Sequence, residues 1–172
     1  MSTKRLCCAM PDGSVRILSY SPEMFNPQSG TRVLLAEKGK LSLSATEQDV
    51  LAFIRAKDAP KDAVTVTVHD VSELPQDRTF RNAWTHDGVN MSVNMPKART
   101  IHLDRIRAVR KSALERLDAD WMKATGQGRV ADAATIESQR QVLRDLPQTL
   151  PVDQCTTPDE LKALWPAELP RR

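Results

Sequence analysis

The chain has 172 residues, enough for one ordinary domain or two small modules but not for two full domains. Apolar residues make up 40% of it and aromatic residues only 4%, so any core must be largely aliphatic. The net charge of +3 is too small for a dedicated nucleic-acid-binding domain. No apolar run approaches the roughly 20 residues of a membrane helix, and the apolar stretch after Arg5 is too short for a signal-peptide core. We therefore expect a soluble chain that folds in a cytoplasm.

The first half of the chain has the pattern of short strands around one helix. Apolar residues in 4–10 and 14–20 flank a Pro-Asp-Gly turn, which predicts a β-hairpin. A short strand is expected at Arg32–Ala36, inside a loop-like stretch. A helix is then expected to begin at a capping box formed by Ser44 and Glu47, and to end before Pro60.

Alternating residues predict further strands after this helix. Between Val64 and His69 the valines alternate with polar residues, which predicts a strand with the valines facing inward. Asp87-Gly88 is typical of a two-residue hairpin turn, with short strands on either side. Phe80 and Trp84 are the largest apolar side chains in this region, and we expect them to lie in the core.

Met95-Pro96 marks the main boundary, because proline is favoured in the first turn of a helix. Residues 97–124 lack glycine and proline and predict one long helix. After a Gly-Gln-Gly break, a second helix is expected from about residue 132 to 145, packed antiparallel to the first and ended by Pro147. A last short helix is expected after a capping box at Thr157. The predicted fold is α+β, with a module of antiparallel strands and one helix at 1–95 and a helical arm at 96–172.

Basic residues dominate the first part of this arm, with seven Lys or Arg against two acids between 97 and 116. The partner-binding candidates are Arg99, Arg107, Arg110 and Lys111. Two interpretations stay open: a solvated face with local ion pairs, or a patch for an acidic protein or for nucleic acid. No aromatic residue is interleaved with these charges, which makes binding of single-stranded nucleic acid less favoured.

Four residues of the arm are expected to be structural. Trp121 can pack against the second helix around residues 142 and 143. Arg140 and Arg144 lie one turn apart and can pair with Asp118 or Asp120 across the hairpin. Trp165, together with the end of the second helix, can close the open end of the hairpin.

No pattern of side chains predicts chemistry. The glycine patterns of phosphate and dinucleotide sites and the nucleophile elbow do not occur. The cysteines lack metal-site spacing, and the histidines are interpreted as ordinary surface or strand residues. These residues are Cys7, Cys8, Cys155, His69, His86 and His102. We therefore expect no catalytic residue, no metal, no cofactor and no enzymatic activity.

Several runs resemble small proteins encoded among bacteriophage tail genes. They are residues 50–60, 74–84, 94–102 (NMPKARTIH), 110–121, 140–147 (RQVLRDLP) and 157–166 (TPDELKALWP). Their order is similar to the phage tail assembly chaperone family and to tail-fibre-associated proteins, although here residues 148–157 lie between the Leu-Arg-Asp helix and the closing Trp-Pro. The resemblance implies a tail structural or assembly protein that binds other tail or tail-fibre subunits, in several copies, in the virion tail or in the host cytoplasm during assembly. The alternative is a basic helical nucleic-acid-binding protein with a regulatory or packaging role.

Overall fold

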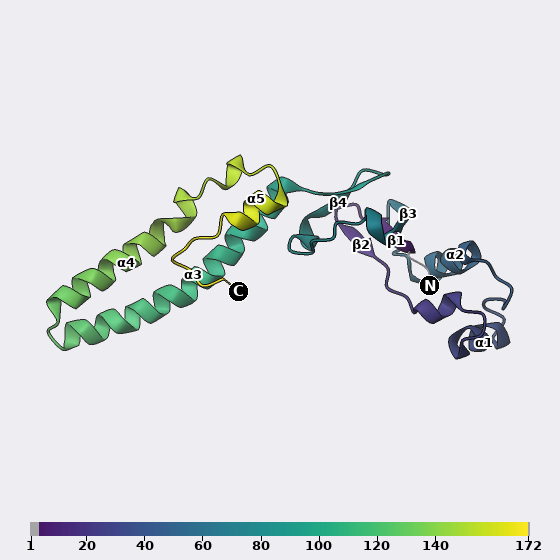
Figure 1. The fold of residues 1–172 in the computed structure, drawn as a ribbon, viewed down its shortest axis with the longest axis horizontal. Helices are drawn as coiled ribbons and strands as arrows, with labels where there is room; N and C mark the ends of the chain where they lie inside the picture. Colours follow the sequence, from purple (N-terminus) through teal and green to yellow (C-terminus); the bar gives the residue numbers. More distant parts are fainter. Residues whose placement is uncertain (1–3, 172) are drawn as a thin grey trace. The chain divides into compact units, whose positions relative to one another are not determined.

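The computed structural model describes residues 4–171, and its fold is α+β as predicted (Figure 1). Antiparallel strands and short helices come first in the chain, and a packed helical hairpin with a short terminal helix follows. The chain divides into two compact units, Met1–Val93 and Asn94–Arg172, which we call the front unit and the helical arm. No helix within residues 4–171 is long and apolar enough to cross a membrane.

A three-stranded antiparallel sheet is the centre of the front unit. Its order is β2 (Val15–Ile17), β1 (Lys4–Ala9) and β3 (Thr65–Asp70), so β1 is the middle strand. Cys7 is paired with Ile17 on one side and Thr67 on the other. Both edges of β1 are paired, and its side chains Leu6 and Cys8 pack into the core with residues 50, 51 and 54, so its central residues are almost completely buried. The predicted first hairpin is confirmed, and its turn places Gly13 at φ 74°, a conformation that favours glycine.

The strand predicted at residues 32–36 is wrong, because this segment forms α1 (Gly30–Glu37). Ser29 caps the helix by accepting the Arg32 backbone N–H. The fully buried Arg32 side chain donates to Ser42 O at 2.8 Å from Nε, to Ala45 O at 2.7 Å from Nη2, and to Met24 O from Nη1. These bonds link the segments on both sides of α1 to the helix, and they could not be inferred from its local sequence.

The following helix, α2 (Glu47–Asp58), ends before Pro60 as predicted but begins at a different cap. Thr46 accepts the Asp49 backbone N–H, and the Asp49 carboxylate accepts the Thr46 N–H. The capping box predicted for Ser44 is therefore displaced by two residues. Thr46 and Asp49 have the three-residue spacing that such a box requires, and the Ser44 N–H donates instead to Ser42 Oγ at 3.2 Å.

The strand β3 is present, and its valine side faces the core only in part. Val66 packs against the core, whereas Val64 and Val68 are 67% and 47% exposed. The opposite side is not fully solvated as predicted, because His69 is buried. The second hairpin, β4 (Trp84–His86) and β5 (Met91–Val93), is also present, with Phe80 and Trp84 buried as predicted. Its register pairs His86 with Met91, so the loop has four residues, not two. The Asp87 carboxylate stabilises this wider loop by accepting the N–H groups of the third and fourth loop residues at 2.8 and 2.7 Å.

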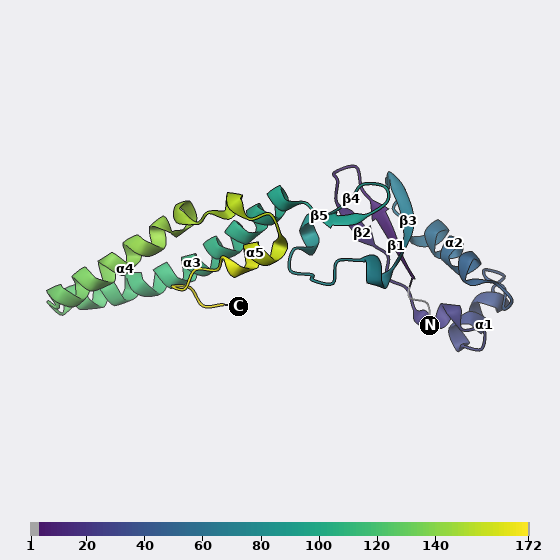
Figure 2. The ribbon, with the colours of Figure 1, turned by 45° about the horizontal axis from the view of Figure 1, so that its top comes forward.

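The helical arm is a hairpin of two long helices, visible in both ribbon views (Figures 1 and 2). The first, α3 (Met95–Gly126), begins at the Asn94 cap with Pro96 in its first turn, and α4 (Val130–Thr149) returns antiparallel. The predicted stop at Pro147 is wrong. Pro147 lies in the last turn of α4, and the helix extends only two residues beyond it.

The arm is completed by a short turn η4 (Val152–Gln154) and by α5 (Pro158–Ala163) with its predicted Thr157–Glu160 capping box. The chain after α5 runs back against the hairpin and places Leu169 in its core. The buried members of that core are Ile106, Val109, Leu143, Leu146 and Leu169. The arm therefore has its own hydrophobic core, which fixes the positions of the charged side chains on its surface.

Candidate functional site

Two of the predicted partner-binding arginines face inward within the arm. Arg99 Nη2 donates to Cys155 O at 2.8 Å, and Arg110 Nη1 donates to Arg144 O at 3.0 Å. The Nε atoms of both arginines are buried and have no hydrogen-bond partner among the described residues. Arg99 and Arg110 therefore join α3 to the segments packed on it, and their main contribution is to the stability of the hairpin.

The other two candidates lie on the exposed side of α3. Arg107 Nη1 is 2.8 Å from Asp104 Oδ1, a surface ion pair one turn apart on the helix, and Lys111 is exposed one turn further on. A surface pair of this kind contributes little free energy, and the Asp104 carboxylate offsets the charge of Arg107 locally. The structure thus does not bring the four predicted basic residues together into one patch.

Arg140 is the centre of the polar contacts between α3 and α4. Its Nε donates to Asp118 Oδ1 at 2.7 Å, as predicted, and it also pairs with Glu137. Arg144, predicted to reach across to Asp118 or Asp120, instead pairs with Glu137 on its own helix at 2.9 Å. The hydrogen bond from Arg144 and the nearby Arg140 lower the pKa of Glu137 below its ordinary value.

The two structural tryptophans occupy different environments. Trp165, predicted to close the open end of the hairpin, packs against the core, and its Nε1–H donates to Leu169 O at 3.1 Å. Trp121 was expected to pack on residues 142 and 143 of α4. It lies instead beside the guanidinium of Arg140, whose Cζ is 5.3 Å from the ring centroid. Val142 is left 48% exposed.

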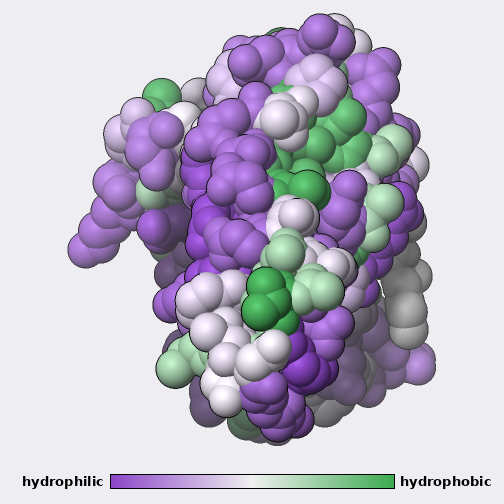
Figure 3. All heavy atoms as spheres, turned by 90° about the vertical axis from the view of Figure 1, so that its left-hand side faces the viewer, coloured by the Kyte–Doolittle hydropathy of each residue, from purple (hydrophilic) through white to green (hydrophobic). Residues whose placement is uncertain are grey.

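This exposed valine lies in a groove of about 520 Å3 between α3, α4 and the C-terminal segment. Its apolar lining is Ala113, Leu117, Val142, Leu143 and Pro170. Charged and polar side chains from the same three segments surround these residues: Arg116, Asp120, Gln139 and Glu168. Figure 3, which faces the α3–α4 turn, shows further hydrophobic residues interrupting the hydrophilic surface of the arm. The arrangement is an apolar surface with a charged rim, which is typical of protein-binding sites.

The front unit contains a histidine cluster that the sequence analysis missed. His69 Nε2 and His86 Nε2 lie 2.8 Å apart, and Thr67 Oγ1 is 3.0 and 3.2 Å from these two atoms. His69 Nδ1 faces Glu73 Oε2 at 3.4 Å, and the Gly88 N–H donates to His86 Nδ1 at 2.9 Å. The alternation of Thr67 with His69, followed by a carboxylate four residues later, was the available signal.

The hydrogen bonds of this cluster assign its protons. Because His86 Nδ1 accepts a hydrogen bond, the proton of the neutral ring is on Nε2, which donates to His69 Nε2. The His69 proton is then on Nδ1 and points toward Glu73. Burial, followed by the neighbouring His69, lowers the pKa of His86, which favours this neutral state. His69 lies in a strand as predicted, but it is buried in this cluster. The prediction is wrong for His102, which lies in α3 and is 3% exposed.

These proton positions decide whether the cluster can act as a nucleophile with its base. Thr67, His69 and Glu73 have the order of a nucleophile, a base and an orienting carboxylate. However, the His86 N–H occupies the Nε2 lone pair that His69 would need to accept the threonine proton. Within residues 4–171, no group of three or more His, Cys, Asp or Glu side chains is placed to hold a metal ion. The cluster is best described as a polar connection between β3 and the second hairpin.

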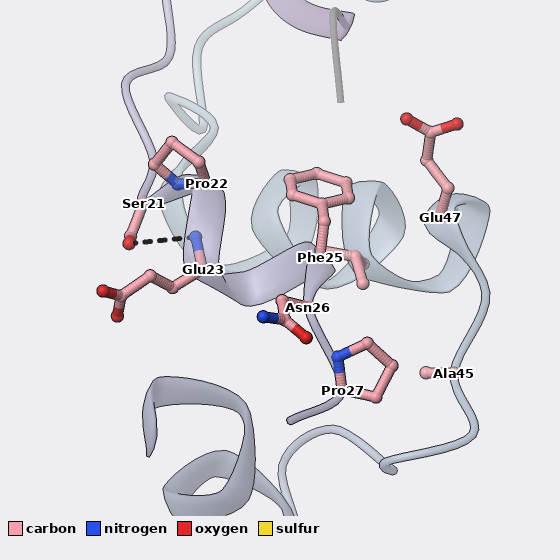
Figure 4. A pocket seen from close by; sticks show the side chains of 9 residues that line it. Ser21, Pro22, Glu23, Phe25, Asn26, Pro27, Ala45 and Glu47 are labelled. Atoms are coloured by element: carbon pink, nitrogen blue, oxygen red, sulfur yellow. Dashed lines mark hydrogen bonds between the residues drawn. The ribbon is translucent and has the colours of Figure 1, made fainter. Parts of the chain in front are cut away.

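A further pocket of about 780 Å3 lies between η1 (Pro22–Phe25) and the start of α2. Figure 4 shows the Phe25 ring standing between Pro22 and Glu47, with Glu23 directed outward from η1. The lining residues combine apolar surface with two carboxylates and include no histidine, cysteine or lysine. This composition offers a binding surface and no nucleophile activated by a neighbouring base.

Comparison with protein-family models, with curated proteins and with solved structures finds no match to this chain.

Proposed function

We propose that the chain is a non-enzymatic structural or assembly protein of a bacteriophage tail, which binds another tail or tail-fibre subunit through the groove of its helical arm. The phage assignment is supported by the resemblance of residues 94–102, 140–147 and 157–166 to tail-associated proteins. The binding mode is supported by the structure of the arm, and the observation that carries it is the apolar groove around Leu117 and Val142.

The groove is suited to binding because its apolar residues are fixed before a partner arrives. Leu143 is buried in the core of the arm, whereas Val142, the next residue on α4, remains accessible. Arg140 and Asp118 hold the two helices at this level through their 2.7 Å hydrogen bond. A rigid apolar surface needs little reorganisation on binding, so more of the free energy of burial becomes affinity.

The alternative function, nucleic-acid binding through the basic part of α3, is less well supported. Arg99 and Arg110 donate to backbone carbonyl groups within the arm, and Arg107 is paired with Asp104. Few guanidinium groups of the predicted patch are therefore left to contact phosphates. Gel-shift measurements of duplex DNA at low salt test this alternative. We expect Arg107→Gln to leave the mobility of the DNA unchanged.

The test of the proposal is co-expression with each tail and tail-fibre subunit encoded in the same phage genome, followed by size-exclusion chromatography. We expect one subunit to form a complex that Val142→Asp weakens by about tenfold or more, because a carboxylate would be buried in apolar contact. Ala108→Asp is the matched control, since Ala108 is exposed on α3 about 180° around the helix from Leu117. A genome without tail genes around this one would contradict the phage assignment.

A further inference from the structure

A pocket of about 830 Å3 lies against the free edge of β2 in the front unit. One wall is the segment 14–19, which contains β2, and the other is formed by residues between 78 and 84, where η3 (Arg81–Ala83) leads into β4. The strands β2 and β4 lie near each other in both ribbon views but belong to different sheets (Figures 1 and 2). The pocket is therefore bounded by β2 and by the segment that leads into β4.

The pocket is strongly basic. Four arginines line it: Arg5, Arg16, Arg78 and Arg81. One acidic residue, Asp58, is among the lining residues, and it is paired with Lys57 at 3.6 Å. Arg5 is held in place by Lys4 O and by the ring of Tyr20, whereas the other three arginines are exposed. Guanidinium groups at this density favour an anionic ligand, and each can bind a carboxylate through two parallel hydrogen bonds.

The β2 edge supplies hydrogen-bonding groups of a second kind. The Leu18 N–H donates to Leu6 O, and Ser14 O accepts from the Met10 N–H, so the even-numbered residues of this segment bond to β1. In an antiparallel ladder the alternate residues then direct their N–H and C=O groups away from the partner strand. For Val15 and Ile17 this direction is toward the pocket. A row of such groups is a template for a further strand.

The indole of Trp84 lies in the wall of the pocket. Trp84 lines the pocket and is 6% exposed, and its Nε1–H has no hydrogen-bond partner within the described chain. The Nε1 atom is itself buried, so it is not available as a donor to an incoming chain. The indole forms part of the pocket wall, and its resonance reports on binding there.

We propose that this pocket binds an extended acidic segment of a partner protein, which adds to β2 as a further strand and places its carboxylates on Arg16, Arg78 and Arg81. Addition of a peptide to a sheet edge is an established mode of recognition, with backbone bonds supplying affinity and side-chain pockets supplying specificity. A free phosphate or a nucleic acid would satisfy the arginines but would leave the N–H and C=O groups of the strand edge unused. This site lies in the front unit, so it is independent of the groove that carries the proposed function.

The test uses the full-length protein and a short, acetylated and amidated peptide in which glutamate alternates with valine. Binding is measured by calorimetry and by NMR of 15N-labelled protein. We expect saturable binding, with shifts of the Val15 and Ile17 amide resonances and of the Trp84 indole resonance. N-methylation of alternate peptide residues retains the charge and blocks the strand edge, so the methylated peptide should bind about tenfold more weakly or worse.

The variant Arg16→Gln/Arg81→Gln should also bind the acidic peptide about tenfold more weakly or worse. Its matched control is Lys38→Gln/Lys61→Gln, which removes the same charge from exposed positions outside the pocket and should leave the affinity unchanged. Thermal unfolding of both variants checks that they remain folded. Equal weakening by the two variants, or unchanged binding of the methylated peptide, would overturn strand addition at this site. Tighter binding of pyrophosphate or of an oligothymidylate would overturn the choice of a peptide ligand.

Discussion

Arg140 lies beside the ring of Trp121, with its Cζ 5.3 Å from the ring centroid, and so joins the two long helices at the middle of the hairpin. The same guanidinium donates to Asp118 and pairs with Glu137, and it is 15% exposed. A cation that is shared between a ring and two carboxylates is more strongly held than a simple surface pair.

We therefore predict that Arg140→Gln destabilises the helical arm by about 1–2 kcal/mol, since it removes the cation–π contact and the ion pairs of a largely buried side chain. Urea unfolding of the arm, followed by the amide resonances of α3 and α4, measures this change. Arg129→Gln is the control, because the Arg129–Asp132 pair is exposed and should contribute less than about 0.5 kcal/mol. Equal effects of the two substitutions would refute the special role of Arg140.

Arg32 should be essential for the packing around α1. Arg32→Met preserves most of the side-chain volume but leaves three backbone carbonyl groups, those of Met24, Ser42 and Ala45, without their donor. We expect a loss of about 2–4 kcal/mol in the stability of the front unit, measured by urea unfolding. Arg55→Met, on the exposed side of α2, should cost less than about 0.5 kcal/mol. A tolerated Arg32→Met would mean that these carbonyl groups find other donors.

Prediction from sequence succeeded where the deciding residues are local. The long helix α3 follows from Pro96 at its start and from the absence of glycine before Gly126. The helix α1 could not be predicted, because the bonds of Arg32 reach Met24 on one side and Ala45 on the other. The acceptors for those bonds become adjacent only after the unit has folded.

The candidate sites also differ in whether local sequence or the folded structure brings their residues together. The Arg140–Asp118 pair was predictable, because a short turn between two helices sets their antiparallel register. The histidine cluster was missed because His69 and His86 meet only when β3 and the second hairpin pack together. The four arginines of the β2 pocket lie at positions from 5 to 81, so no spacing in the sequence connects them.

The histidine cluster should make the front unit less stable in mild acid. The folded pKa of His86 is lowered from 6.5, whereas the unfolded chain binds a proton at its ordinary pKa. Below about pH 6.5 the unfolded state therefore takes up more protons, and the stability of the front unit should fall as the pH decreases. Urea midpoints between pH 7.5 and 5.5, followed by amide resonances of the front unit, measure the slope, which His86→Gln should reduce. The same slope in His86→Gln would assign the titration to other groups.

The buried thiol of Cys7 should make the stability of the front unit fall as the pH rises in the alkaline range. Burial, followed by the neighbouring Cys8, raises the pKa of the Cys7 thiol from 9.0 to about 11. Between these two pH values the unfolded chain is ionised and the folded thiol is not, so stability should fall as the pH rises from 9 to 11. Cys7→Ala should lower the stability at neutral pH through lost packing but flatten this alkaline decline. A decline of unchanged steepness in the variant would exclude Cys7 as its source.

The most direct test of the account is site-specific photo-crosslinking in phage-producing cells, with a photoreactive amino acid at position 142 in the groove or at position 108 on the opposite face of α3. Mass spectrometry then identifies the attached protein. The account predicts an adduct with one tail or tail-fibre subunit from position 142 and none from position 108. An absence of adducts at position 142, or the same mixture of unrelated proteins from both positions, would contradict it.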